Sequence, residues 1–303
     1  MSNPYLLETP AVISFSGGRT SGYMLWHILQ AFGGTLPDGV KVIFNNTGKE
    51  RPETLDFVER CSQEWGVDVI WLEYLRDEFK PVVTKGRNGQ PSIGRHGYTV
   101  VNYATASRGG EPFNQLLEVM EEFRRESKGR DPVLPNVVQR FCTGEMKIRT
   151  PGRYLTDCGW SLEEVTDAIG LRADEPNRLA KLHEKASKKT EVWQCGNPVA
   201  PLGAAGVSES DVMRFWAEQS FDLGLKQHEG NCDLCFLKSR NKIRHIMRDR
   251  PDLAGWWIEA ESKTGQRFRK DRPGYRALLN EQDLTDFMED EADELSIACH
   301  CTD

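Results

Sequence analysis

Residues 11–25 read AVISFSGGRTSGYML and join two hydrophobic patterns through a pair of glycines. The apolar run at 11–15 is short and bounded, which predicts a buried strand rather than a helix. After Ser21 the apolar residues recur at the spacing of a helix with one buried face. Gly17 and Gly18 permit backbone angles that other residues avoid, and the N–H groups at a helix start can receive an anion. The segment predicts a phosphate-binding turn, although an ordinary strand–helix turn has the same pattern.

The alternation of strand and helix continues along the chain. Residues 40–45 and 67–72 are apolar runs of strand length, and a helix begins between them at Pro52. A strand, a charged turn and a helix follow over residues 165–185. This order predicts an α/β protein with a Rossmann-like, doubly wound parallel sheet. Residues 76–112 are glycine-rich and predict an irregular insertion over the site.

The sequence divides near residue 205. We expect a nucleotide-binding α/β domain over residues 1–205 and a helical C-terminal region with a cysteine pair and an acidic tail over residues 206–303. Ser208, with an acidic residue three positions later, is a typical helix start.

The composition excludes some classes of protein. No apolar run approaches the roughly 20 residues that span a bilayer, so we expect no membrane partner. The start, MSNPYLLETP, lacks the pattern of a secretion signal, which predicts a cytoplasmic location. A net charge of −7 argues against a general nucleic-acid coat, but 39 Lys and Arg residues leave room for a local basic patch.

Eight cysteines in a reducing compartment are not expected to form a disulfide set. Cys232 and Cys235 form a C-x-x-C pair, a spacing with which one turn can bind a metal centre. Cys142 and Cys195 each stand beside polar or turn-forming residues. Cys61 and Cys158 lie on predicted helices, and we expect them to be packing residues.

Five segments, in order, resemble the phosphoadenosine phosphosulfate reductase family of the PP-loop, adenine-nucleotide alpha-hydrolase-like superfamily. They are SGGRTS at 16–21, FNNTGKERPETLDFV at 44–58, RFCTGEMKIRTP at 140–151, IGLRADEPNR at 169–178, and the run from NPVAPL to GNCDLC at 197–235. The resemblance extends over about residues 11–250. It implies a Rossmann-like sheet that binds an adenylyl nucleotide at the carboxyl ends of its strands.

The resemblance also assigns roles to residues. The implied nucleotide-binding set is Ser14, Ser16, Gly17, Gly18, Arg19, Thr20, Ser21, Asn45, Asn46, Thr47 and Gly48. The implied catalytic set, which would grip the reacting anion, is Lys147, Arg172 and Arg178, with Cys301 of the tail sequence Cys299-His300-Cys301 as a further candidate nucleophile.

Three cysteines match the family's ligands to a 4Fe-4S cluster, namely Cys142, Cys232 and Cys235. We expect Cys195 to supply the fourth thiolate, and four thiolates also fit a structural zinc ion. The family therefore implies an iron–sulfur oxidoreductase or sulfurtransferase that acts on ATP or a phosphosulfate nucleotide. A thiol electron donor or a sulfur-donor protein would be its partner, and a homo-oligomer stays open.

Two alternatives remain at this stage. ATP-splitting members of the superfamily carry Asp where this chain has Thr20, whereas typical reductases lose the double glycine that it keeps. One alternative is an ATP pyrophosphatase that releases AMP and pyrophosphate and activates a tRNA or DNA acceptor for thiolation. The other is a nucleotide-binding protein without catalysis, held together by zinc.

Overall fold

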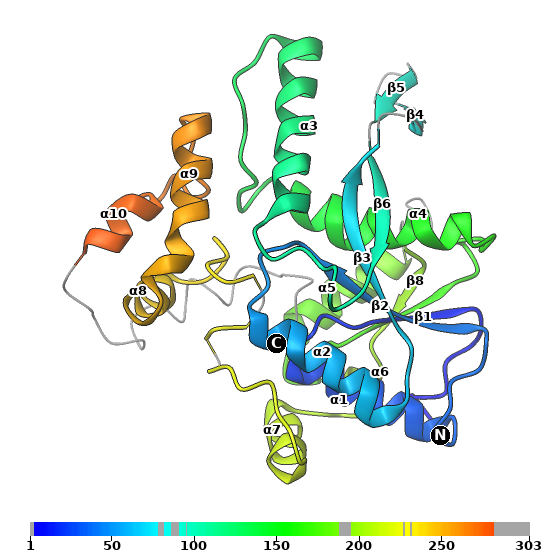
Figure 1. The fold of residues 1–303 in the computed structure, drawn as a ribbon. Helices are drawn as coiled ribbons and strands as arrows, with labels where there is room; N and C mark the ends of the chain where they lie inside the picture. Colours follow the sequence, from blue (N-terminus) through cyan, green and yellow to red (C-terminus); the bar gives the residue numbers. More distant parts are fainter. Residues whose placement is uncertain are drawn as a thin grey trace.

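The computed structural model describes residues 3–77, 82–85, 91–94, 96–187, 195–226, 228–230 and 232–281. At its centre lies a six-stranded sheet in the order β6-β3-β2-β1-β7-β8 (Figure 1). Its strands are β1 (Ala11–Ser14), β2 (Val40–Asn46), β3 (Val69–Arg76), β6 (His96–Val101), β7 (Thr166–Ile169) and β8 (Asn197–Val199). Neighbours pair in parallel except β3 and β6. The predicted α/β, Rossmann-like fold class is confirmed.

One face of the sheet is covered by α1 (Arg19–Ala31) and α2 (Pro52–Trp65), with α7 (Glu209–Glu218) packed on α1. Ile13 and Phe44 from the strands pack there with Ile28 and Phe57 from the helices. A Cβ on Gly22 would lie 2.8 Å from Trp216 Cζ2, so a glycine lets α1 and α7 approach closely. The predicted helix start at Ser208 is confirmed, because its N–H donates to the Asp211 carboxylate at 2.9 Å.

The opposite face is covered by α4 (Thr150–Asp157) and the segment before β7. Val12, Ile43 and Leu72 pack there against Leu155 and Cys195. Before α4 lies η1 (Thr143–Arg149), a π-helix, a rare form that often occurs at functional sites. The remaining helices of the sheet domain are α3 (Glu111–Lys128), α5 (Pro176–Ser187) and α6 (Pro201–Ala204).

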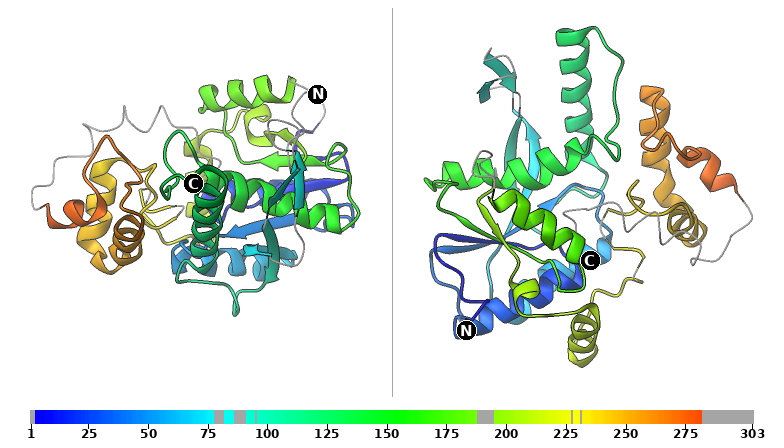
Figure 2. Two further views of the ribbon diagram at one scale, coloured as in Figure 1. Left: turned by 90° about the horizontal axis from the view of Figure 1, so that it is seen from above. Right: turned by 180° about the vertical axis from the view of Figure 1, so that it is seen from behind.

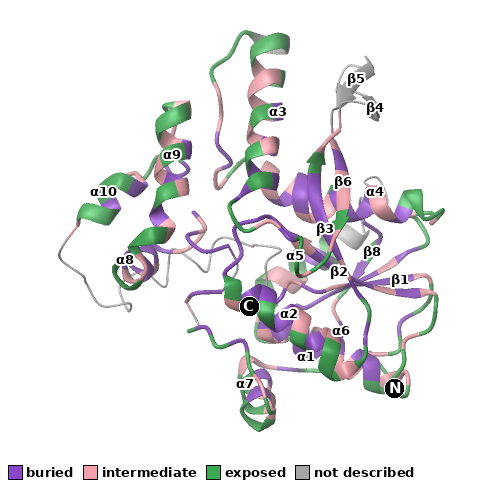
Figure 3. Cartoon of the chain, viewed as in Figure 1, coloured by how far each residue is buried: buried purple, intermediate pink, exposed green. Residues whose placement is uncertain are grey.

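A second core lies to one side of the sheet in both orientations of the ribbon (Figures 1 and 2). It is formed by α8 (Arg240–Asp249), η2 (Pro251–Leu253), α9 (Ala254–Thr264) and α10 (Tyr275–Asn280). Trp257, Phe268 and Tyr275 are buried at its centre, and Phe113 of α3 and Met146 of η1 pack into it. Figure 3 shows that α8 and α9 each carry both buried and exposed positions.

Two boundaries differ from the prediction. α1 begins at Arg19, and β3 begins two residues late and continues to Arg76. The irregular insertion predicted over 76–112 is partly wrong, because β6 joins the main sheet and β4 (Val82–Lys85) pairs with β5 (Pro91–Gly94). The sequence of β6, HGYTVV, is rich in β-branched and aromatic residues, which favour a strand once β3 offers a free edge.

The division at residue 205 stays a prediction; α7, which follows it, packs with the sheet domain. No helix among the described residues has the length and apolarity that crossing a membrane requires.

Candidate nucleotide site and cysteine turn

The glycine turn leaves β1 and enters α1 through a compact loop at residues 16–21. Gly17 has φ +79°, a conformation that favours glycine, and a Cβ there would lie 2.7 Å from Thr54 Cγ2. The hydroxyls of Ser16 and Ser21 are 2.9 Å apart, and Ser21 Oγ also donates to Gly18 O at 3.0 Å. These bonds fix the conformation of the loop.

The start of α1 faces out of this loop. No described side chain caps it, and its first turn contains no acidic residue. The first N–H groups of a helix have no partner within the helix, and the helix dipole favours negative charge there. The loop therefore has the chemistry of a phosphate site.

Arg172 connects the loop after β7 to this phosphate site. Its Nη1 donates to Thr20 Oγ1 at 3.0 Å, and its Nε donates to Asp174 Oδ1 at 3.0 Å. Arg178 pairs with Glu175, and the other oxygen of Glu175 accepts the Arg172 N–H at 3.0 Å. Arg172 thus contacts the loop, whereas Arg178 acts on it through Glu175.

Arg19 forms hydrogen bonds with the segment that follows α7. Its Nε donates to Asp222 Oδ1 at 2.7 Å, and its Nη2 donates to Leu225 O at 3.0 Å. The side chain thereby fastens the segment after α7 to the start of α1.

The end of β2 and the loop after it, residues 45–51, form a second wall. Asn46 Nδ2 donates to Glu73 Oε1 at 2.6 Å, and Asn46 Oδ1 accepts the Gly48 N–H at 3.1 Å. Gly48 has φ +74°, and a Cβ there would lie 3.0 Å from Gly110 Cα. Asn45 Oδ1 is buried without a hydrogen-bond partner among the described groups, which leaves an acceptor that a ligand can satisfy.

Glu50 is the hub of this second wall. One carboxylate oxygen accepts from the Thr47 N–H and the Thr47 hydroxyl, both at 2.7 Å. The other oxygen lies 3.5 Å from Lys147 Nζ of η1 and accepts from Cys232 Sγ at 3.8 Å. One buried carboxylate therefore joins the strand-end loop, a predicted catalytic lysine and a predicted metal ligand.

The C-x-x-C turn is clamped to the same loop. Glu50 and Cys232 form an antiparallel bridge, and the Asp233 N–H donates to Lys49 O at 2.7 Å. Lys49 Nζ and Asp233 Oδ2 are 3.0 Å apart, and Asp233 Oδ1 accepts from Trp257 Nε1 at 2.7 Å. The Tyr275 hydroxyl also holds the turn, because it donates a hydrogen bond to Leu234 O at 2.6 Å.

The N-terminal part of the chain, which contains the phosphate loop, matches a known protein family. Residues 10–90 match the phosphoadenosine phosphosulfate reductase domain. The resemblance to that family is thereby confirmed from β1 through the loop after β3. Lys147, Arg172 and the C-x-x-C turn lie beyond the matched reductase-domain segment.

Two individual proteins are also similar. The "Uncharacterized nin region protein ORF290" of Escherichia phage lambda is 29% identical over 242 residues, which is 80% of this chain and 71% of the relative. The solved structure of the U34-tRNA thiolase NcsA from Methanococcus maripaludis, with its 4Fe-4S cluster, aligns over 92% of this chain and 75% of that chain. The identity of that alignment is 13% and its TM-score is 0.34, which supports no inference about function.

The structure does not bring the four predicted metal ligands together. Cys142, Cys232 and Cys235 pack in the cluster around Trp257, whereas Cys195 packs against Val12 and Val165 of the six-stranded sheet's cluster. Among the residues that the structure describes, no three His, Cys, Asp or Glu side chains are grouped closely enough to hold a metal ion. Cys299, His300 and Cys301 lie outside the described residues.

Cys195 belongs to a buried site of its own. Ser14 Oγ donates to Asp167 Oδ1 at 2.8 Å. The hydroxyl of Ser14, a predicted nucleotide-binding residue, is therefore bonded to a buried carboxyl group of β7. Burial raises the pKa of Asp167 to about 7. Burial, and next the negative charge of Asp167, raise the pKa of the Cys195 thiol. A thiol in such surroundings stays protonated, which disfavours it as a metal ligand.

Sequence reasoning missed the acidic and basic partners of the motif residues, namely Lys49, Glu50, Glu73, Glu175 and Asp233. Four of them, Lys49, Glu50, Glu175 and Asp233, stand inside the quoted motifs. The one sequence signal that could have indicated these partners is their place in a motif. Charged residues are mostly solvent-exposed, however, so that signal does not predict a buried ion pair.

Proposed function

We propose that the chain is an iron–sulfur enzyme that binds an adenylyl nucleotide and carries out sulfur transfer or reduction at its phosphate or sulfate end. The observation that carries the proposal is the clamp between residues 45–51 and the C-x-x-C turn, with the Glu50–Cys232 bridge at its centre. It supports a single site in which a nucleotide and a thiol-held group lie next to each other. ATP and a phosphosulfate nucleotide are both candidate substrates.

The nucleotide would be held by the two walls already described. The loop at 16–21 offers N–H donors to phosphate oxygens, and Arg172 adds a guanidinium to the same anion. Asn45 Oδ1, the buried acceptor without a partner, fits an amino or hydroxyl group of the nucleoside. Lys147, held by Glu50, would place a positive charge on the opposite side of the reacting end.

The donor chemistry around the turn partly fits a cluster. Cys142, Cys232 and Cys235 belong to one hydrophobic cluster, in which Cys232 also contacts the Glu50 carboxylate, and Cys195 belongs to another. We therefore propose three protein ligands, Cys142, Cys232 and Cys235, in place of the four expected from the sequence; their thiols would have to move closer together than they lie in this structure to hold a cluster. A cluster held there would supply electron transfer or a binding position for sulfur.

The cluster is tested by single Cys→Ser variants of protein purified without air. We expect Cys142, Cys232 and Cys235 each to be required for iron, acid-labile sulfide and broad absorption near roughly 400 nm. Cys195→Ser is the matched control and should keep all three signals. Colourless protein with one zinc ion per chain would contradict the cluster and favour the structural-zinc alternative.

The reaction is tested by its products. With a phosphosulfate nucleotide and a dithiol, reduction releases sulfite, the dithiol being oxidised to a disulfide. With ATP and an acceptor, activation releases pyrophosphate, the outcome that the double glycine at residues 17–18 favours. Nucleotide binding without either product would contradict an enzymatic role.

A further inference from the structure

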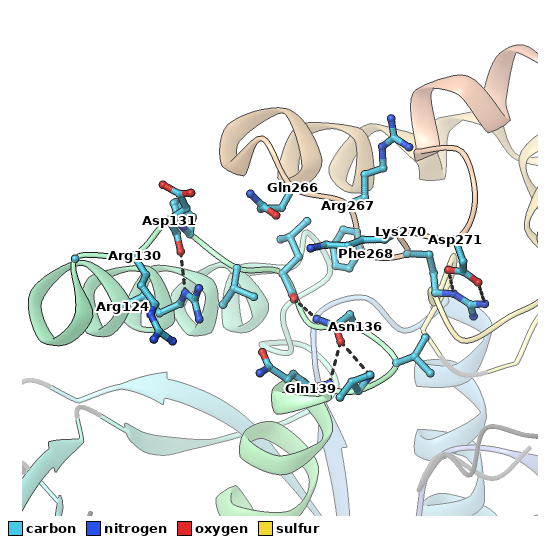
Figure 4. Close-up of a pocket in the computed structure, with 17 residues that line it drawn as sticks. Arg124, Arg130, Asp131, Asn136, Gln139, Gln266, Arg267, Phe268, Lys270 and Asp271 are labelled. Carbon is cyan, nitrogen blue, oxygen red and sulfur yellow. Dashed lines mark hydrogen bonds and ion pairs between the residues drawn. The ribbon is translucent and has the colours of Figure 1, made fainter.

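A pocket of about 850 Å³ lies between the segment after α3 and the segment after α9, apart from the candidate nucleotide site. One wall is formed by residues 129–139, and the other by residues 266–271 (Figure 4). Its lining residues extend from Arg124 and Arg130 at one end to Lys270 and Asp271 at the other.

The pocket is basic in a chain with a net charge of −7. Five cationic side chains line it against two carboxylates, which leaves an excess of three positive charges; the cations are Arg124, Arg130, Arg267, Arg269 and Lys270. Arg269 is paired with Asp271, with Nε 2.7 Å from Oδ1, and Arg124 donates to Asp131 O at 2.7 Å. Arg130, Arg267 and Lys270 are exposed. Asp131 and Asp271, which follow Arg130 and Lys270 in the chain, are the two lining carboxylates, and Glu261 is an acidic neighbour of Arg267, so the excess of three positive charges is that of the lining alone.

The rest of the lining suits a chain of nucleotides better than a small anion. The volume exceeds the needs of one phosphate, and the charges are distributed along the pocket. Gln139 and Gln266 offer amide donors and acceptors, and Val138, with 91% of its surface exposed, offers an apolar contact. Proteins bind single-stranded nucleic acid with a positive groove that follows the backbone, usually together with aromatic side chains on which bases stack; here the positive groove is the shared feature, and the base contacts would come from Val138 and the two glutamines. Because the charges line a hollow rather than a projecting helix, they fit a single strand better than a duplex groove.

Both walls lead to the cysteine turn. The segment 129–139 continues directly to Cys142 and η1. On the other wall, Phe268 is fully buried and packs on Phe236, with ring centroids 5.6 Å apart, and Phe236 follows Cys235 in the chain. A strand in the pocket would therefore lie against Phe268, which packs on the residue that follows Cys235.

We infer that this pocket binds the phosphodiester backbone of a single-stranded segment of RNA or DNA. The inference deepens the proposed function, on which it rests, by naming a nucleic acid as the acceptor for sulfur. RNA and DNA share the backbone chemistry, and the test separates them.

The test measures binding of fluorescein-labelled strands of about 12 nucleotides, as RNA, as DNA and as duplex DNA, to anaerobically purified protein. The pocket variant Arg130→Gln/Arg267→Gln/Lys270→Gln is compared with Arg60→Gln/Arg214→Gln/Arg248→Gln, which removes the same charge from exposed positions elsewhere. We expect the pocket variant to lose affinity by about 100-fold at 0.1 M salt, and the slope of log K against log salt to fall by about 2. The control variant should bind as the wild type does.

Equal loss in both variants, no loss in the pocket variant, or tighter binding of the duplex would overturn the inference. Calorimetric titration with ATP measures nucleotide binding separately from strand binding. It therefore distinguishes failure of this inference from failure of the proposed function. If the pocket variant binds ATP normally but loses the strand, the inference stands. If no nucleotide binds to any variant, the proposed function fails, and strand binding still decides the role of the pocket.

Discussion

Lys49 Nζ lies 3.0 Å from Asp233 Oδ2, and the two side chains are only 8% and 4% exposed. The pair joins the loop after the second strand to the C-x-x-C turn across 184 positions of sequence (233 less 49). Removing one partner of a buried ion pair leaves an uncompensated charge, which costs about 3–5 kcal/mol.

We therefore expect Lys49→Met and Asp233→Asn each to lower the free energy of unfolding by about 3 kcal/mol or more, and to lower iron content. Chemical denaturation and iron analysis measure both effects. Arg60→Gln, which removes an exposed charge, is the control and should change stability by less than about 0.5 kcal/mol. Loss below about 1 kcal/mol in both variants would show that the clamp does not hold the turn.

Glu50 and Lys147 should act as a unit, since their charged atoms are 3.5 Å apart and Lys147 is only 16% exposed. A double-mutant cycle of Glu50→Gln and Lys147→Met should give a coupling free energy of about 0.5–3 kcal/mol in unfolding. Glu64→Gln, at an exposed position of α2, should couple to Lys147→Met by no more than about 0.5 kcal/mol. Additive effects of Glu50 and Lys147 would remove Glu50 from its role as the hub.

The two loop glycines should differ when replaced by alanine. Gly17→Ala forces φ +79° on a residue with Cβ and brings that atom 2.7 Å from Thr54 Cγ2, so it should cost about 1–3 kcal/mol of stability and abolish nucleotide binding. Gly18 has φ −101°, which alanine adopts readily, so Gly18→Ala should fold normally. Calorimetric titration with ATP and with a phosphosulfate nucleotide then measures binding without a folding defect. Undiminished affinity in Gly18→Ala would show that the backbone there does not approach phosphate.

Arg172 and Arg178 should have unequal effects on turnover. Arg172 touches Thr20 of the phosphate loop, whereas Arg178 pairs with Glu175, whose other oxygen accepts the Arg172 backbone N–H. We expect Arg172→Lys to lower kcat by about 100-fold, since one preorganised donor to a reacting anion contributes about this much. Arg178→Lys should retain most of the activity, because lysine can still pair with Glu175. Similar losses in both would show that the two arginines contact the substrate alike.

Asp167 should make the stability of the protein depend on pH. Burial raises the pKa of Asp167 from 3.8 to about 7, so the folded state keeps a proton that the unfolded state releases. The stabilisation from this group is complete below about pH 4 and is lost as the pH rises toward 7. The free energy of unfolding of Asp167→Asn, relative to wild type, should therefore rise between these pH values by up to about 4 kcal/mol. Denaturation curves across this range check the slope, and a pH-independent difference would show that Asp167 is ionised in the folded protein.

The sheet and the phosphate loop could be predicted because their signals are local. Two glycines between an apolar run and an amphipathic run describe β1, its loop and α1, and Pro52 marks the start of α2. These segments also contain the motif that matches the reductase domain.

The partners of the site could not be predicted, because they depend on contacts between distant segments. Nothing in the sequence of residues 45–51 shows that Lys49 meets Asp233 or that Glu50 meets Cys232. Cys195 illustrates the opposite error: its neighbours in sequence suggested a ligand, but the fold buries it beside Asp167 on another face of the sheet. Spacing alone could not separate it from Cys142, which the fold does bring to the cluster of Cys232.

The central position of β1 in the sheet determines when the sheet can be completed during translation. One neighbour of β1, β2, is synthesised directly after it, but the other, β7, ends at Ile169, past the middle of the chain. During translation one edge of the central strand therefore remains open and apolar while more than half of the polypeptide is produced. Open strand edges pair with other chains. Ribosomes that stop before Ile169 should consequently yield aggregates rather than small nucleotide-binding proteins, although the whole phosphate loop is already present in them.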